Sequence, residues 1–156
     1  MPGCDAYVTI AASMPRIELW MTVFAGLAGG LAGVLWSGLV TTPRLARDGL
    51  APAGDSQAET AARIFAGAAL RAAAGAALGF LFWLGWGLIA VVGWPWYAIG
   101  LLYGALAWAA LAAPTLGTLL LRGHGPARPL AAHAIEWLFT CLAIGLLCAF
   151  AWHRYA

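Results

Sequence analysis

The chain has 156 residues, of which 63% are hydrophobic and 9% are charged, and its mean hydropathy is +0.86. A soluble domain carries about a quarter charged residues, so this composition cannot cover the surface of a water-soluble globule, and it excludes disorder as well. The net charge of +2 is too small for a nucleic-acid surface, and no nucleic-acid partner is expected. The sequence therefore predicts an integral membrane protein whose principal partner is the lipid bilayer.

Four apolar segments are long enough to cross a hydrocarbon core, which takes about 20 helical residues. The expected spans follow an extracytoplasmic tail over 1–18 and cover about 19–42, 64–92, 97–121 and 130–152. Pro43 and the arginines after it are expected to end the first span, and Gly/Pro-rich segments separate the last three. Unpaired backbone groups are very costly in lipid, and the alternation of a barrel strand is missing. The expected fold class is therefore all-α, a transmembrane four-helix bundle forming one domain over 19–156.

The arginines predict the orientation, because the chain contains no lysine. The side that holds the loops 43–62 and 122–129 carries Arg44, Arg47, Arg63, Arg122 and Arg128. The opposite side carries only Arg16 and Arg154. The positive-inside rule then places the two loops in the cytoplasm and both termini outside. A composition rich in alanine, glycine and arginine, without lysine or asparagine, is typical of GC-rich bacteria, so a bacterial inner membrane is expected.

The first and third spans share a pattern that is consistent with an internal duplication. Gly33-Val34-Leu35 lies ten residues before Pro43, and Gly104-Ala105-Leu106 lies ten residues before Pro114. Gly75 of the second span likewise matches Gly145 of the fourth, with offsets of 71 and 70. Two parallel-repeat helical hairpins would produce this pattern, as in some transporters. Chance similarity in a chain so rich in alanine, glycine and leucine is the competing explanation.

Pairs of glycines four residues apart occur in three of the four spans. Such pairs let helix backbones approach closely in lipid, where there is little hydrophobic drive for association. The expected helix-packing residues are Gly26, Gly29, Gly30, Gly33, Gly75, Gly79, Gly100 and Gly104. They indicate either packing within the chain or an interface with another subunit or a second copy. Packing within the chain is favoured, because each helix needs neighbours in any case.

Three ionisable residues are expected to meet inside the bundle. Arg71 lies roughly 10 Å deep in the second span, and Glu136 lies at a similar depth in the fourth, counted from the same side. His133 is on the same helical face as Glu136, one turn shallower. The cluster indicates a polar pocket open to the cytoplasm that binds an anion, a lipid head group or a proton, or a structural ion pair. The structural ion pair is favoured, since an arginine at this depth can reach the interface.

Other constellations are too weak to predict chemistry. His133, Glu136 and the loop residue His124 are too few and too poorly spaced to predict a metal site. Cys141 and Cys148 lie seven residues apart in an apolar span, which is typical of buried small side chains rather than of a redox pair. We therefore predict no catalytic residue, no metal and no cofactor. Trp83, Trp86 and Trp108 lie deep in their spans and need packing or a partner for the indole N–H.

Three functional classes remain after these exclusions. The sequence favours a non-enzymatic accessory or scaffold subunit that packs through its Gly/Ala helix faces. The alternative is a small transporter or channel, in which Arg71, His133 and Glu136 line a vestibule facing the cytoplasm. A membrane enzyme acting on a lipid or a quinone is the least supported class. A transporter needs a polar path beyond the cluster, whereas a scaffold has a dry interior.

Overall fold

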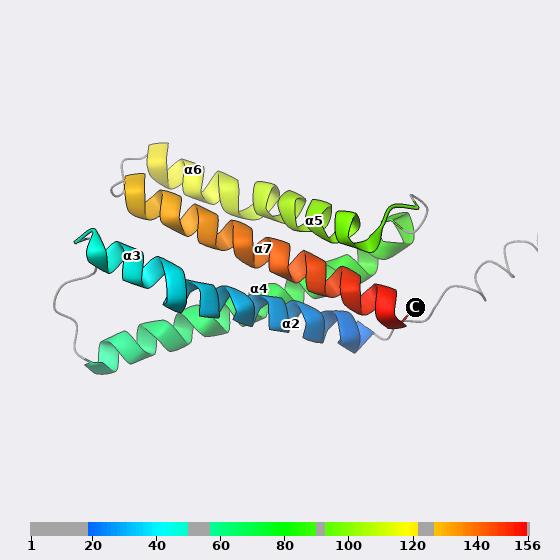
Figure 1. Cartoon of the computed structure of the whole chain (residues 1–156), viewed down its shortest axis with the longest axis horizontal. Helices are drawn as coiled ribbons and strands as arrows, with labels where there is room; N and C mark the ends of the chain where they lie inside the picture. Colours follow the sequence, from blue (N-terminus) through cyan, green and yellow to red (C-terminus); the bar gives the residue numbers. More distant parts are fainter. Residues whose placement is uncertain (1–18, 50–56, 90–92, 122–126, 156) are drawn as a thin grey trace, which may run out of the picture.

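The computed structural model describes residues 19–49, 57–89, 93–121 and 127–155, and all the secondary structure in them is helical (Figure 1). It contains four helices long and apolar enough to cross a membrane: Leu19–Arg47, Ile64–Gly85, Trp96–Leu121 and Arg128–Arg154. The expected fold class, an all-α chain with four spans, is thus confirmed.

Two of the four helices are uninterrupted, and two contain a π-helical turn. The uninterrupted helices are α4 (Gln57–Ile89) and α7 (Ala127–Tyr155). The first helix consists of α2 (Leu19–Trp36), the π turn η1 (Ser37–Thr41) and α3 (Thr42–Arg47). The third consists of α5 (Trp96–Ala107), the π turn η3 (Trp108–Ala112) and α6 (Ala113–Leu121).

The first helix does not end at Pro43, as the sequence had led us to expect, but continues to Arg47. The π turn before the proline explains the difference, because the N–H of Thr42 bonds to the carbonyl of Ser37, five residues back. Pro43 follows in the first turn of α3, and local π adjustments of this kind let a helix in lipid continue through a proline. The helix ends instead where Gly49 adopts a left-handed conformation, with φ of 68°.

The second and fourth helices extend beyond the apolar segments that were predicted as membrane spans. The second starts at Gln57 rather than 64, and its predicted last residues, 90–92, lie outside the described part of the chain. The fourth starts at Ala127 rather than 130. Pro129 falls in its first turn, where a proline is well tolerated, so it does not delay the start of the helix.

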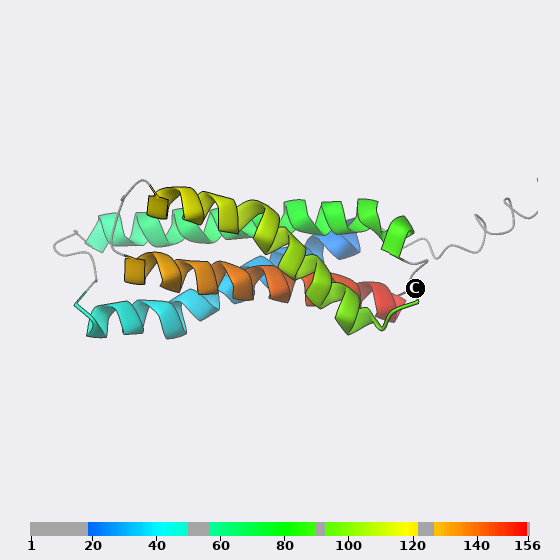
Figure 2. The same cartoon turned by 90° about the horizontal axis from the view of Figure 1, so that it is seen from above.

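The helices pack in the order α4, α2, α7, α5 (Figures 1 and 2). α2 and α7 are the central pair, and α4 and α5 lie on the two outer sides. α4 and α5 meet over a short stretch, where the Tyr103 hydroxyl donates a hydrogen bond of 2.6 Å to the Leu78 carbonyl. α2 therefore has to accommodate two neighbours, α4 and α7.

Glycines on one side of α2 make the crossing with α4. A Cβ atom on Gly26 would overlap the carbonyl oxygen of Gly75, and one on Gly75 would overlap the carbonyl oxygen of Gly26. A Cβ on Gly79 would lie 3.2 Å from the Cα of Val23. The two backbones are thus in direct contact, which only residues without a side chain permit.

Glycines on the other side of α2, together with those of α5, pack against α7. A Cβ on Gly29 would lie 2.6 Å from the Cα of Ile144, and one on Gly33 would overlap the side chain of Thr140. A Cβ on Gly104 would lie 2.6 Å from the carbonyl oxygen of Cys141, and one on Gly100 would lie 2.8 Å from that of Gly145. With Gly30, which contacts α4 at Arg71, all eight glycines of the predicted set pack against another helix of this same chain.

The two hairpins share a π turn but not all of their contacts. The π turns Ser37–Thr41 and Trp108–Ala112 are 71 residues apart, which is the offset found in the sequence, and a proline follows each one. Each hairpin also has a glycine-to-glycine crossing, Gly26 with Gly75 and Gly100 with Gly145. The aligned pairs differ, because Gly29 and Gly33 face the other hairpin whereas Gly100 and Gly104 face their own partner helix.

The ends of the helices agree with the predicted pairing of the loops. α3 and α6 end, and α4 and α7 begin, at one end of the bundle (Figures 1 and 2). Arg44, Arg47 and Arg128 are exposed there, whereas Arg154 is exposed at the other end, together with Leu19. Arg16 and Arg122 lie outside the described residues.

Adding one methyl group at the α2–α4 crossing should destabilise the bundle. We expect Gly75→Ala to lower the free energy of unfolding by about 1–3 kcal/mol, since the methyl group has to force two backbones apart. Reversible unfolding in mixed micelles measures this change. Gly117→Ala is the matched control, because nothing lies within 4 Å of a Cβ at Gly117. Equal stability of the two variants would contradict the close crossing.

Candidate functional site

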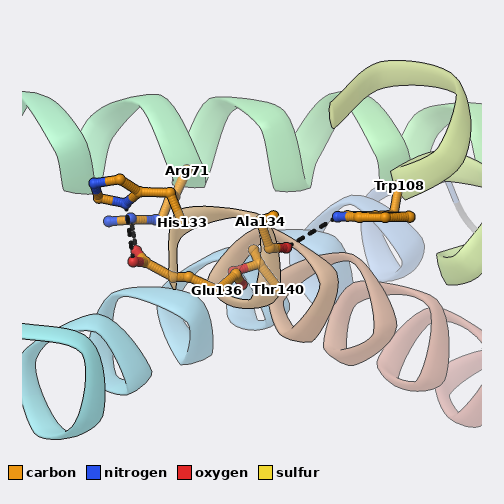
Figure 3. Close-up of polar contacts among 6 residues, drawn as sticks. All are labelled: Arg71, Trp108, His133, Ala134, Glu136 and Thr140. Atoms are coloured by element: carbon orange, nitrogen blue, oxygen red, sulfur yellow. Dashed lines mark hydrogen bonds and ion pairs between the residues drawn. The ribbon is translucent and has the colours of Figure 1, made fainter. Parts of the chain in front are cut away.

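The arginine-rich end of the bundle is the one at which Arg44, Arg47 and Arg128 are exposed. Near it lie three ionisable side chains in contact, those of Arg71, His133 and Glu136 (Figure 3). α4 supplies Arg71, and α7 supplies the other two residues. The Nη2 atom of Arg71 pairs with Oε1 of Glu136, and Nδ1 of His133 lies 3.4 Å from Oε2 of Glu136. Each oxygen of the carboxylate thus has its own cationic or ionisable neighbour.

The three side chains differ in their exposure. Glu136 is fully buried, Arg71 is 15% exposed and His133 is 50% exposed. The histidine therefore lies between the buried carboxylate and the surface of the bundle. An ionised carboxylate in such a place is very costly without a partner, and Arg71 supplies the positive charge that compensates for it.

Two glycines of α2 bring the ion pair together. Gly30 lets α4 approach at Arg71, since a Cβ there would overlap the Arg71 carbonyl oxygen and lie 3.3 Å from the Cα of Ala72. Gly33 lets α7 approach at Thr140, one turn after Glu136. α4 and α7 make few direct contacts, so α2 sets the distance between them.

The guanidinium of Arg71 is only partly satisfied. Its Nε atom is buried and has no hydrogen-bond partner among the described residues. Its Cζ atom lies 5.8 Å from the ring centroid of Trp137, within the range of a cation–π contact. Arg71 thus depends on one carboxylate and one aromatic ring, both supplied by α7.

Two further polar side chains lie beside the cluster, but neither reaches the carboxylate (Figure 3). The Thr140 hydroxyl donates a hydrogen bond of 2.9 Å to the backbone carbonyl of Glu136. The Trp108 indole N–H, which was expected to need a partner, donates one of 3.0 Å to the carbonyl of Ala134. This second bond ties the π turn η3 to α7 next to the cluster, and no sequence motif indicates it.

The interior beyond the cluster is apolar. Its buried residues are Leu78, Phe82, Ile99, Cys141, Ile144, Cys148, Ala149 and Trp152. Thr22 is also fully buried there, but its hydroxyl donates to the carbonyl of Leu19 in its own helix, at 3.0 Å. Within the described residues, no chain of charged side chains continues from the cluster toward the other end.

The remaining candidates do not add ligands to the site. The described residues contain no group of three histidine, cysteine or acidic side chains that could hold a metal ion, and His124 lies outside them. Cys141 and Cys148 are buried free thiols, and the Cys148 Sγ lies 3.5 Å from the Thr22 carbonyl oxygen, to which it donates a weak hydrogen bond. Both cysteines belong to the packed interior.

The chain was compared with known protein families, curated proteins and solved structures. No protein family, no curated protein and no solved structure matches this chain. The chemistry of the site therefore has to be argued from its own residues.

Removing one partner of the ion pair should cost more than removing both. We expect Arg71→Met to lower the free energy of unfolding by about 3–5 kcal/mol, because it leaves the buried carboxylate without a counter-charge. Combining it with Glu136→Met should restore most of this loss. Unfolding in mixed micelles distinguishes the two results. If the double variant is as unstable as the sum of the single variants, the two side chains do not interact.

Proposed function

We propose that this chain is a non-enzymatic accessory or scaffold subunit of a membrane assembly. The observation that supports this proposal most is the apolar interior between the Arg71–Glu136 pair and the opposite end of the bundle. A solute path across the membrane needs polar groups along its length, whereas the hydroxyls of Thr22, Thr140 and Tyr103 in the described interior are all bonded to backbone carbonyls. Such a bundle is suited to provide a stable surface rather than a pathway.

The contact with a partner would use the outer surface of the bundle. The eight glycines are already used by helix contacts within the chain, so they leave no free small-residue face of the predicted kind. The outward side chains are large and apolar, among them Leu39, Phe65 and Leu121. Lipid and apolar surfaces of other membrane subunits are both compatible with such side chains.

The proposal includes an orientation in a bacterial inner membrane. The exposed Arg44, Arg47 and Arg128 would face the cytoplasm, and both chain termini would lie outside. The Arg71–Glu136 pair would then lie close to the cytoplasmic leaflet.

A second candidate is a small transporter with a vestibule on the same side. The observation that favours it is the half-exposed His133, which leads to a fully buried carboxylate beside an arginine whose Nε is unpaired. Ionisable groups inside spans often mark the path of an ion or a substrate.

Native mass spectrometry of the protein, released gently from its own membrane, distinguishes the two candidates. A scaffold should leave the membrane with a second subunit at a fixed ratio, and the double variant Arg71→Met/Glu136→Met should retain that subunit. A chain that is released alone in both detergent and lipid nanodiscs would contradict the scaffold. If the wild-type chain carries a solute into proteoliposomes and the double variant does not, the transporter would be favoured.

A further inference from the structure

We propose that His133 and Glu136 form a proton-binding site in which Arg71 is the fixed counter-charge. This inference does not depend on whether the chain is a scaffold or a transporter. It follows from an arrangement in which a fully buried carboxylate has a permanent cation on one oxygen and a half-exposed imidazole beside the other.

The cluster can take up one additional proton, on His133 or on Glu136. With His133 neutral, the guanidinium and the carboxylate cancel, so the buried pair carries no net charge. The imidazole is the one side chain whose ordinary titration falls near neutral pH, and its Nδ1 lies 3.4 Å from Oε2 of the carboxylate. The two groups are close enough to share a proton, which then belongs to the pair rather than to either residue.

Few other charges act on this site. The helices packed against α7 at this level are α4 and the segments α2, η1, η3 and α6. The residues from Leu19 to Thr41 and from Trp108 to Leu121 include no acidic, basic or histidine side chain. Arg71 is the charged group that α4 directs at Glu136. Of the other charged residues, Arg128 lies at the start of α7, and Glu59 and Arg63 lie near the start of α4, whereas Arg71 is the one paired with the carboxylate.

The exposure of His133 provides the path for the proton. A hydronium ion at the surface protonates Nε2 of the imidazole and leaves as water, and Nδ1 then passes its own proton to Oε2 of Glu136. The products are a neutral carboxylic acid and a neutral imidazole. The separation of 3.4 Å is longer than a hydrogen bond, so the half-exposed histidine has to move slightly closer before the transfer.

Protonation has a structural consequence. A neutral Glu136 no longer compensates for the charge of Arg71, whose Nε already has no hydrogen-bond partner among the described residues. The ion pair is the main polar link between α4 and α7, which otherwise share few contacts. Proton uptake therefore loosens α4 from α7 at the arginine-rich end.

Infrared difference spectroscopy of the full chain in lipid nanodiscs tests the site directly. As the pH falls from about 8 to about 5, the range in which an imidazole titrates, a carboxylic-acid C=O band should appear. Labelling of the glutamate side-chain carboxyl carbons with ¹³C should shift this band. Glu136→Gln should abolish the band, whereas Asp48→Asn, a change at an exposed acidic residue, should leave it in place.

A pH jump tests the role of His133. The band should appear at least about tenfold more slowly in His133→Gln, because the proton then lacks its relay. The absence of a glutamate band over this range, a band that persists in Glu136→Gln, or an unchanged rate in His133→Gln would each overturn the proposal. If Glu136→Gln does not fold, the isotope shift in the wild-type chain decides, with Glu59→Gln as the variant that keeps the band.

Discussion

Direct backbone contact along α2 is the constraint on which the rest of this bundle depends. Lipid offers helices little hydrophobic reason to associate, so their contacts must come from close packing. α2 achieves this on two sides at once, with Gly26 and Gly30 against α4 and with Gly29 and Gly33 against α7. A Cβ atom at Gly26, Gly29 or Gly30 would meet the backbone of a neighbouring helix, and one at Gly33 would meet the side chain of Thr140. The spacing of the central helices is therefore set by the absence of side chains in α2.

The same spacing makes the buried charges tolerable. Arg71 and Glu136 belong to helices that contact each other little, and each would be very costly alone in an apolar interior. Gly30 and Gly33 bring these helices near enough for the ion pair to form. Packing and electrostatics are thus coupled, and a proton on Glu136 would act on the contact between α4 and α7. Beyond this pair, the buried side chains of the described residues are mostly apolar.

The composition and the Pro/Gly-rich or charged segments between the apolar runs were enough to predict four spans. Counting residues from the ends of these spans was enough to place Arg71 and Glu136 at a common depth. The first and fourth helices run past the predicted span limits at Pro43 and Pro129, because a π turn precedes Pro43 and Pro129 lies in the first turn of α7. The partners of the glycines could not be predicted, because they depend on the order of the helices, α4–α2–α7–α5. The hydrogen bond from the Trp108 indole N–H to the Ala134 carbonyl depends on the same order. The sequence therefore indicated that this N–H needs a partner, but not which residue provides it.

A double-mutant cycle between Arg71 and Glu136, measured in the wild-type chain and again in a Gly30→Ala background, tests most directly whether α2 sets the ion pair. The methyl group of Gly30→Ala meets the backbone of Arg71 and should move α4 outward. The account predicts a coupling energy of about 1 kcal/mol or more in the wild-type background and a value near zero with Gly30→Ala. The same coupling energy in both backgrounds would show that the charges find each other without the glycine contact, and would contradict the account.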